Sequence, residues 1–519
     1  MMRVDGVASP TPSPTPTATV ISRDAPLYDT STRASARDFE HTAMFEVLNV
    51  PLAFAFACFR PKRMSKPTTS RSPRPAHAAS DRSSMSRSIV VVGGGNAAGY
   101  LVRALVSADP TLGARTLVIG AEDVAPYERP ALTKGFLHKE SPPRLPGFHT
   151  CVGGGGERQT PEWYEQHGVE LRLNTTVTAA DFKSRTVTTS AGESIGYETL
   201  VLATGCGVIR LPEAIGGTLP GVHYVRNNAD GLALVEAMDK ATKAVVVGGG
   251  YVGLEVAASC ATRGLKPEVV MMEPHVMARL WNADIAQHYE RLYETRGTTF
   301  HRSSKLKAIL ADADGKARGI ELESGAVIDA DLVVVGVGAT APVPFTGLDA
   351  PEGRVGGIKV DSRFRASGAD VAPGSVYAIG DIAAFPLKLA DNEIVRMEHV
   401  KHARDSATLV GNIIAGKSDD EYDYTPFFYS RVFEHPGTER AVNWVFHGLQ
   451  RGEIITIGNL DPTLAAFWID DGKCVGIMLE SGAPERVAAL AAAVRARKSV
   501  DVSALRACAS VDDALALVL

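Results

Sequence analysis

Two glycine-rich segments stand out as places where a phosphate group could bind. The first is SIVVVGGGNAAGYLVRALVSA and the second is KAVVVGGGYVGLEVAASCATRG. Their spacing is GxGxxA and GxGxxG, at Gly93, Gly95 and Ala98 and at Gly248, Gly250 and Gly253. In this pattern the first glycine makes the tight turn, the second lets the backbone approach a pyrophosphate, and the small third residue lets helix and strand pack closely. The helix N-terminus supplies N–H donors to the phosphates.

Each glycine segment is followed by a second apolar run that ends at an acid. RTLVIG leads to Glu122, 24 residues beyond Ala98, and PEVVMM leads to Glu273, 20 residues beyond Gly253. A carboxylate there can accept the hydroxyl groups of an adenosine ribose. One glycine pattern alone is weak evidence, but two complete units about 155 residues apart predict two dinucleotide sites.

Glu273 also bears on which nicotinamide nucleotide the second unit binds. A carboxylate at this position bonds the free 2′-hydroxyl of NADH and repels the 2′-phosphate of NADPH. Arg279 lies six residues further on and could soften that repulsion. The sequence therefore favours NADH and leaves NADPH open.

The remaining composition excludes several other kinds of chemistry. The six cysteines, at 58, 151, 206, 260, 474 and 508, form no CxxC or CxxxxC pattern. A zinc site, an iron–sulfur cluster, a disulfide framework and a dithiol redox pair are therefore not expected. His399 and His402 are three residues apart without matching ligands elsewhere, so no metal site is predicted. The net charge is −5, which gives no reason to expect nucleic acid as a partner.

The first 87 residues differ in composition from the rest of the chain. They are rich in Ser, Arg, Ala and Pro and carry twelve basic against seven acidic side chains, which leaves residues 88–519 with a net charge of −10. This composition favours an organelle transit peptide, for the chloroplast stroma or the mitochondrion. The alternatives are a disordered tail, or translation that starts at Met44, Met64 or Met85, with a cytoplasmic protein. No apolar run reaches the length of a membrane span, so no membrane partner is expected.

The segments after each glycine unit resemble those of the flavoprotein reductases that contain two dinucleotide folds. ATG at 203–205, LVVVGVGA at 332–339 and SVYAIGDIA at 375–383 match the places where the chain passes between domains in that family. The resemblance makes the first unit the FAD site and the second, inserted unit the NAD(P) site. It also implies that Asp381 binds the ribityl chain of FAD; the alternative is that Asp381 caps a helix.

APYERPALTKGFLHKE, at 125–140, narrows the resemblance further. PYERPxLxKG is found in ferredoxin reductases of oxygenase systems, in relatives of apoptosis-inducing factor and in the monodehydroascorbate reductases of plants and algae. Three more stretches, at 145–171, 397–407 and 421–433, are similar to the last of these. From Ser88 to Gly482 the chain resembles monodehydroascorbate reductases, which implies that NADH reduces FAD and that FAD then reduces two monodehydroascorbate radicals to ascorbate.

The resemblance also implies roles for individual residues. Positions that match FAD-binding residues are Gly93, Gly95, Asn96, Ala97, Ala98, Glu122, Arg129, Lys134 and Asp381, with weaker matches at Val177, Arg226 and Val400. Positions that match the NAD site are Gly248, Gly249, Gly250, Tyr251, Val252, Gly253, Leu254, Glu255, Glu273, Arg279 and Gly338. Glu398 and His399 match the place where flavin and nicotinamide meet. The substrate pocket is matched by Arg404, Tyr429 and Arg431, with Gly153 nearby.

The chemistry of the acceptor agrees with those assignments. The radical is a small monoanion with its charge spread over several oxygens, and a guanidinium offers it several donors in one plane. Because electrons are what move, no residue is needed as a nucleophile or general base. The alternative for Arg404 is an ordinary salt bridge, and for Tyr429 it is core packing.

Cys151 lies beside a glycine loop, but it has no nearby partner cysteine, so no redox role is predicted for it.

The predicted fold class is α/β, with two Rossmann-like domains and a C-terminal α+β domain. The predicted limits are 1–87 for the N-terminal segment, 88–210 and 338–406 for the two parts of the FAD domain, 211–337 for the NAD domain and 407–519 for the C-terminal domain. The protein is expected to be a monomer or a weak homo-oligomer. Two rival functions remain: a ferredoxin or rubredoxin reductase, which should carry a basic docking rim, and a protein like apoptosis-inducing factor, in which the flavin turns over very slowly.

Overall fold

In the computed structural model, the first dinucleotide unit forms a parallel sheet whose five strands lie between residues 89 and 378. The structure describes residues 88–140, 142–150, 156–435, 440–458, 464–480 and 484–519. The sheet order is β19-β7-β1-β2-β3, with strands Val376–Ala378, Thr199–Leu202, Ile89–Val92, Thr116–Ile119 and Glu170–Arg172. The three central strands, β7, β1 and β2, consist almost entirely of Val, Ile and Leu because both of their faces are covered. Helices α1 (Asn96–Ala108) and α6 (Val400–Ile414) pack together so closely that a Cβ at Gly411 would lie 2.5 Å from the Ala104 Cβ.

The second unit repeats this architecture. Its parallel sheet has the order β12-β11-β10-β16-β9, with strands Thr299–His301, Glu268–Val270, Ala244–Val247, Leu332–Val335 and Val222–His223. Helices α3 (Asn228–Lys240), α4 (Tyr251–Thr262) and α5 (Ala283–Thr295) belong to this part of the chain. A three-stranded antiparallel sheet follows α5 and β12, with strands β13 (Leu306–Ala311), β14 (Ala317–Leu322) and β15 (Val327–Asp329).

Two connections carry the chain into and out of this inserted unit, and they pair with each other. Strand β8 (Gly207–Val208) lies antiparallel to β17 (Ala339–Thr340). The first unit also carries two small sheets, β4 (Val177–Asp181), β5 (Thr186–Thr189) and β6 (Ser194–Gly196), and β18 (Ile358–Lys359), β20 (Ala383–Leu387) and β21 (Glu393–Arg396). The second unit is therefore inserted into the sequence of the first, and the chain enters and leaves it through two neighbouring strands.

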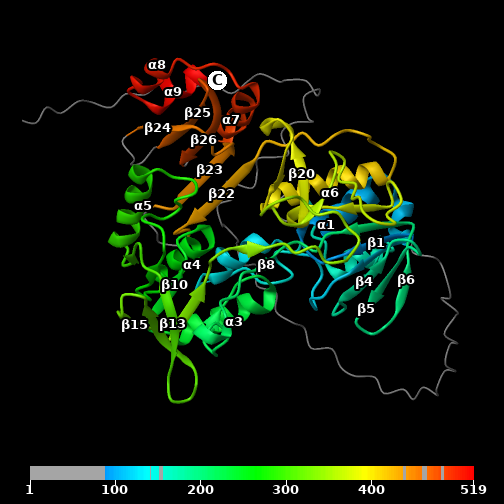
Figure 1. Ribbon diagram of the computed structural model, residues 1–519, viewed down its shortest axis with the longest axis horizontal. Coiled ribbons are helices and arrows are strands. Elements are labelled where there is room, and N and C mark those ends of the chain that lie inside the picture. Colours follow the sequence, from blue (N-terminus) through cyan, green and yellow to red (C-terminus); the bar gives the residue numbers. More distant parts are fainter. Residues whose placement is uncertain (1–87, 141, 151–155, 436–439, 459–463, 481–483) are drawn as a thin grey trace, which may run out of the picture. The chain divides into compact units, whose positions relative to one another are not determined.

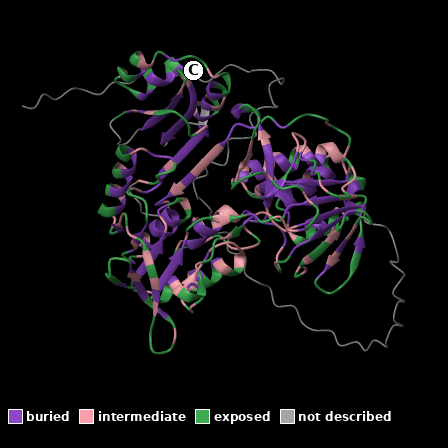
Figure 2. Cartoon of the chain, in the orientation of Figure 1, coloured by how far each residue is buried: buried purple, intermediate pink, exposed green. Residues whose placement is uncertain are grey.

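The C-terminal part is an antiparallel sheet with helices. The order is β22-β23-β26-β25-β24, with strands Phe427–Val432, Val442–Gly448, Lys473–Glu480, Ala465–Asp470 and Glu453–Ile457. Helices α7 (Pro484–Ala496), α8 (Val502–Arg506) and α9 (Val511–Val518) follow. Figure 1 shows β22 running from this sheet toward α4, and Figure 2 shows its central strands as buried. The predicted class, two dinucleotide folds and a C-terminal α+β domain, is confirmed, whereas the residue limits of the domains stay a prediction.

None of the helices in the described part of the chain is long and apolar enough to cross a membrane.

Candidate functional site

The first glycine turn forms a backbone cradle at the start of α1. Gly93 has φ +125°, and a Cβ there would lie 2.2 Å from the Ala203 carbonyl oxygen, so only glycine is accommodated. Gly95 precedes the first residue of the helix without a side-chain cap. The first N–H groups of α1 are therefore left for another acceptor.

A cavity of about 650 Å³ opens in front of this cradle. Most of the predicted FAD residues line it, together with several of those predicted for the NAD and substrate sites. The predicted residues on its walls are Gly93, Gly95, Asn96, Ala97, Glu122, Arg129, Lys134, Val177, Arg226, Tyr251, Val252, Glu255, Asp381, Glu398, His399, Val400 and Tyr429. The cavity thus brings together residues as far apart in the sequence as Gly93 and Tyr429, which are 336 residues apart.

One end of the cavity is organised by Glu122, which follows β2. Its carboxylate accepts a hydrogen bond from the Tyr127 hydroxyl at 2.7 Å and forms an ion pair with Arg129. Arg129 also donates to the Arg226 carbonyl oxygen at 2.9 Å. The acid that the sequence assigned to the ribose is therefore held in place by two side chains of the APYERP segment.

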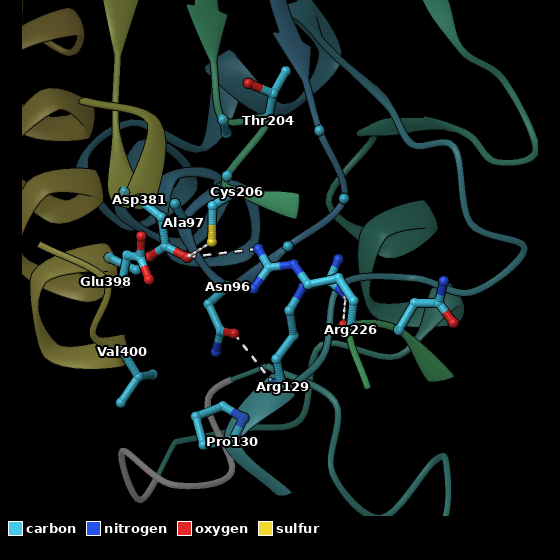
Figure 3. Close-up of a pocket in the computed structure, with 18 of the residues that line it drawn as sticks. Asn96, Ala97, Arg129, Pro130, Thr204, Cys206, Arg226, Asp381, Glu398 and Val400 are labelled. Atoms are coloured by element: carbon cyan, nitrogen blue, oxygen red, sulfur yellow. Dashed lines mark hydrogen bonds and ion pairs between the residues drawn. The ribbon is translucent and has the colours of Figure 1, made fainter. Parts of the chain in front are cut away.

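Asp381 occupies another part of the wall, in the short helix Gly380–Ile382. Its carboxylate forms an ion pair with Arg226 at 3.5 Å and accepts a hydrogen bond from the Cys206 thiol at 3.3 Å, as Figure 3 shows. Burial, together with the charge of Asp381, raises the pKa of Cys206 to about 12. The thiol is therefore protonated and unreactive at neutral pH. Sequence reasoning assigned Cys206 no place in the site.

A buried ion pair joins three segments on the far wall. Lys134 Nζ lies 2.8 Å from a carboxylate oxygen of Glu255 on α4, and Glu255 is only 5% exposed. The same carboxylate accepts hydrogen bonds from the hydroxyls of Thr133 and, at 2.6 Å, of Ser430 on β22. Four polar groups thus satisfy one another around the buried carboxylate, which is what a buried charge requires. Thr133 and Ser430 were missed by the sequence reasoning.

Aromatic side chains form the wall beside this ion pair. Tyr251 stacks on Phe428, with ring centroids 3.3 Å apart, and its buried hydroxyl has no hydrogen-bond partner in the described residues. The Tyr429 ring lies 5.9 Å from Lys134 Nζ and 5.6 Å from the His399 ring. Tyr429 is therefore part of the cavity wall and not of a closed core. No single-residue pattern in the sequence marked Phe428.

His399 is held neutral at this wall. Its Nδ1 accepts a hydrogen bond from the Lys401 backbone N–H at 3.1 Å, at the start of α6. Burial, with the charges of Lys134 and Arg404 next in importance, lowers the pKa of His399 to about 3. The proton of the neutral ring is then on Nε2.

Arg404, on α6, is not among the residues that line the large cavity, and its side chain is 27% exposed. Its Nη2 lies 2.9 Å from a carboxylate oxygen of Glu128. The alternative considered from the sequence, a salt bridge, is thus present. Its Nε is buried and has no hydrogen-bond partner in the described parts of the chain. Arg431 forms an ion pair with Glu434 and lines a second, much smaller cavity with Lys134 and Glu255.

The second glycine turn has nearly the same backbone as the first. Gly248 has φ +119°, and a Cβ there would lie 2.4 Å from the Gly336 carbonyl oxygen. A Cβ at Gly253 would lie 2.0 Å from the Gly248 carbonyl oxygen, which explains the small third residue. Glu273 and Arg279 are both exposed at this edge.

Several predicted residues lie away from the large cavity. Those in the described chain are Ala98, Gly248, Gly249, Gly250, Gly253, Leu254, Glu273, Arg279, Gly338, Arg404 and Arg431. Ala98 is fully buried behind the first turn. Gly153 and Cys151 lie outside the described residues. Within the described part of the chain, no cluster of His, Cys, Asp or Glu could hold a metal ion.

The residues of the large cavity fit FAD. A cavity of about 650 Å³, a glycine cradle at an uncapped helix start, and the two wall acids Glu122 and Asp381 match a pyrophosphate flanked by a ribose and a ribityl chain. Gly93 and Asn96 would face the phosphates, Glu122 the ribose and Asp381 the ribityl chain. Lys134 and Tyr251 would lie at the end of the cavity where α4 begins.

Comparison with known proteins agrees with this fit. Residues 87–407 match the model of the pyridine nucleotide-disulphide oxidoreductase family, and residues 425–510 match that of the monodehydroascorbate reductase 3-like C-terminal domain. The chain is 46% identical over 432 residues to the chloroplastic/mitochondrial monodehydroascorbate reductase of Arabidopsis thaliana, which covers 83% of this chain and 86% of the relative. It is 42% identical to the monodehydroascorbate reductase of Pisum sativum, over 79% of this chain and 95% of the relative.

Solved structures with a similar fold include two reductases. A ferredoxin reductase from Rhodopseudomonas palustris has a TM-score of 0.66 at 28% identity, over 77% of this chain and 93% of that one. Putidaredoxin reductase in its complex with putidaredoxin has a TM-score of 0.69 at 24% identity, over 80% and 96%. Sequence identity is thus much higher to the plant enzymes than to these reductases. The chain belongs to the monodehydroascorbate reductase family, within the pyridine nucleotide-disulphide oxidoreductases.

Proposed function

We propose that this chain is an FAD-dependent reductase that uses NADH to reduce the monodehydroascorbate radical to ascorbate. The observation that carries the proposal is the 46% identity to a plant monodehydroascorbate reductase over 83% of the chain, extended by the C-terminal domain match. The balanced reaction is NADH, one proton and two radical anions giving NAD⁺ and two ascorbate monoanions. FAD, when bound, would supply the chemistry that links a two-electron hydride donor to one-electron acceptors.

The side chains around the cavity bind and orient the partners of this reaction. Glu122 and Arg129 hold one end of FAD, and Asp381 with Arg226 holds another part of it. Tyr251, stacked on Phe428, lines the part of the cavity where α4 begins and offers a flat surface beside which the nicotinamide ring would bind. Glu273 accepts the ribose hydroxyls of NADH, and its exposed carboxylate disfavours NADPH.

The acceptor binds where cations and an aromatic ring meet. Arg404 and Lys134 supply positive charge, Tyr429 supplies a flat surface, and Arg431 adds a further cation. These groups attract a small anion with delocalised charge and position it beside the cofactor. No proton is taken from the acceptor by any of them, since the chemistry is electron transfer.

The plastid or the mitochondrion is the proposed location. The composition of residues 1–87 supports it, as do relatives described as chloroplastic/mitochondrial and chloroplastic. Other relatives are described as cytosolic or peroxisomal, so residues 1–87 are the segment on which this proposal depends. We further propose a monomer or a weak homo-oligomer.

The direct test follows NADH consumption by the full chain while ascorbate oxidase generates the radical. Radical-dependent consumption that falls at least a hundredfold in the Arg404→Ala variant is expected. Flavin that is reduced by NADH but not reoxidised by the radical would contradict the proposal. A protein-partner reductase would then be the better assignment, and reduction of a ferredoxin would test it. A stable reduced state with every acceptor would favour a protein like apoptosis-inducing factor.

A further inference from the structure

A buried carboxylate lies directly behind the predicted acceptor site and was assigned no role by the sequence. Glu128 is 8% exposed, in the APYERP segment between β2 and the short helix Arg129–Thr133. Its Oε2 accepts from Asn96 Nδ2 at 2.6 Å and from Arg404 Nη2 at 2.9 Å, and its Oε1 accepts from the Tyr100 hydroxyl at 2.7 Å. Three donors from two helices therefore converge on one acid.

This arrangement orients the Arg404 guanidinium. Arg404 and Glu128 are 276 residues apart in the chain, and their side chains join α6 to the APYERP segment. The guanidinium carbon also lies 5.1 Å from the centre of the Tyr100 ring. Held at Nη2 and packed on a ring, the planar group has little freedom to rotate, while its buried Nε still lacks a hydrogen-bond partner in the described chain.

The negative charge of Glu128 reduces the electrostatic attraction between Arg404 and an anion. A carboxylate next to Arg404 cancels part of the positive charge that an anionic radical would feel. Lys134 is paired in the same way with the buried Glu255. Arg404 and Lys134 are thus each fixed by a buried glutamate, which favours exact placement over net positive charge.

We propose that Glu128 is the positioning residue that orients Arg404 toward the acceptor, an inference that rests on the proposed function. Glu128 itself does not touch the acceptor. It acts through Arg404, whose remaining donors it directs to the oxygens of a small planar anion. The neutral Tyr100 hydroxyl serves only to hold Glu128.

The alternative role of Glu128 is in the FAD cradle. Asn96, the first residue of α1, donates to Glu128, and its Oδ1 accepts from the Arg129 backbone N–H at 3.3 Å. Glu128 could therefore affect FAD by way of Asn96. The two roles predict different measurements, because one acts on the acceptor and the other on the cofactor.

The test compares Glu128→Gln, Tyr100→Phe, Arg404→Ala and the Glu128→Gln/Arg404→Ala double variant in the full chain. Glu165→Gln, an exposed acid on α2 (Pro161–Gln166), is the matched control. The measurements are KM and kcat for the radical, NADH-dependent reduction of ferricyanide, bound FAD per chain, and Tm. Tyr100→Phe keeps the ring under Arg404 and removes one hydrogen bond, so it stays informative where Glu128→Gln folds poorly.

Glu128→Gln is expected to raise KM for the radical about tenfold, the scale of one lost charge-assisted hydrogen bond, with kcat changed less. Ferricyanide reduction and FAD content should stay within twofold of wild type, and Tyr100→Phe should raise KM about two- to threefold. Adding Glu128→Gln to Arg404→Ala should have no further effect on KM.

Three results would overturn the proposal. An additive effect in the double variant would mean that Glu128 does not act through Arg404. Loss of FAD and of ferricyanide reduction together would place Glu128 in the cofactor cradle. A lower KM would mean that Glu128 only weakens the charge of Arg404. A wild-type enzyme that reduces ferricyanide but not the radical would instead contradict the proposed function, so the two failures are distinguishable.

Discussion

The two glycine turns of this chain have almost the same backbone but very different surroundings. Gly93 and Gly248 have φ values of +125° and +119°, and each faces a carbonyl oxygen at a distance that no Cβ could tolerate. The acid after the first turn, Glu122, is held by Tyr127 and Arg129 inside a cavity. The acid after the second, Glu273, is exposed.

This difference teaches how one fold can serve two kinds of ligand. A site whose polar groups are already fixed by neighbours loses little entropy when its ligand binds, and it can retain that ligand through many turnovers. A site with an exposed, unrestrained acid is suited to a ligand that must leave after each hydride transfer. The contrast supports our proposal that the first turn binds the retained cofactor and the second the exchanging cosubstrate.

The largest expected effect comes from adding one methyl group to each turn. Gly93→Ala should destabilise the fold and release FAD, because the new Cβ would lie 2.2 Å from the Ala203 carbonyl oxygen. Gly248→Ala should keep FAD bound but slow reduction by NADH at least a hundredfold. Flavin absorbance per chain and stopped-flow reduction measure the two outcomes. Gly196→Ala, where a Cβ meets nothing within 4 Å, is the control. Equal loss of FAD in the Gly93 and Gly248 variants would contradict the assignment of different ligands to the two turns.

Neutralising the two acids should sharpen the comparison. Glu122→Gln weakens the pairing with Arg129, so FAD affinity should fall about tenfold while the NADH/NADPH ratio of kcat/KM is unchanged. Glu273→Gln should leave FAD bound and lower that ratio about tenfold, because the repulsion of a 2′-phosphate is removed. FAD titration of the apoprotein and paired kinetics with both nucleotides give these values. An altered nucleotide ratio in Glu122→Gln would contradict the assignment of the first turn to FAD.

Lowering the pH should destabilise the first dinucleotide unit through His402 on α6. This side chain is fully buried between the Tyr422 hydroxyl and the Gly380 carbonyl oxygen. Burial is the main cause that lowers its pKa to about 4. The unfolded chain, with an ordinary pKa near 6.5, then binds the proton more readily. The free energy of unfolding is therefore highest above about pH 6.5 and falls by up to about 3 kcal/mol as the pH drops to about 4. Below that pH the contribution of His402 no longer changes.

The free energy of unfolding measured in urea between pH 7.5 and pH 4 tests this, with FAD release followed in parallel. His402→Phe keeps a ring beside Phe385, which His402 stacks on at 4.7 Å. The variant should be less stable at pH 7 but show a flatter pH profile. An unchanged slope would mean that other groups cause the acid sensitivity.

The smallest effect is expected at Cys206. Because burial raises its pKa to about 12, almost no thiolate exists at pH 8, and alkylation should spare it. Cys206→Ser should keep activity within twofold. Peptide mapping after iodoacetamide treatment checks the first point, and rapid labelling of Cys206 in the FAD-loaded enzyme would show that this wall of the cavity opens.

Local sequence pattern was enough for the two turns and the acids that follow them, because these features depend on neighbours in the chain. The other predicted residues of the cavity wall, such as Arg129 and Asp381, came from the family resemblance and not from a local pattern. Glu128, Ser430 and Phe428 were not predictable in the same way. Ser430 and Glu255 are 175 residues apart, and Arg404 and Glu128 are 276 apart. No local pattern shows which of many acids accepts from a distant side chain, since that choice is made by how the helices and strands pack.

The carboxylate of Glu255 has a mechanical consequence. It lies on α4 of the second unit, yet it is bonded to Thr133 and Lys134 of the first unit and to Ser430 of the C-terminal sheet. A hinge rotation between these parts would separate the buried Glu255 carboxylate from these three partners, which is unfavourable for a buried charge. We therefore expect the three segments to stay together at this carboxylate when other parts of the chain move.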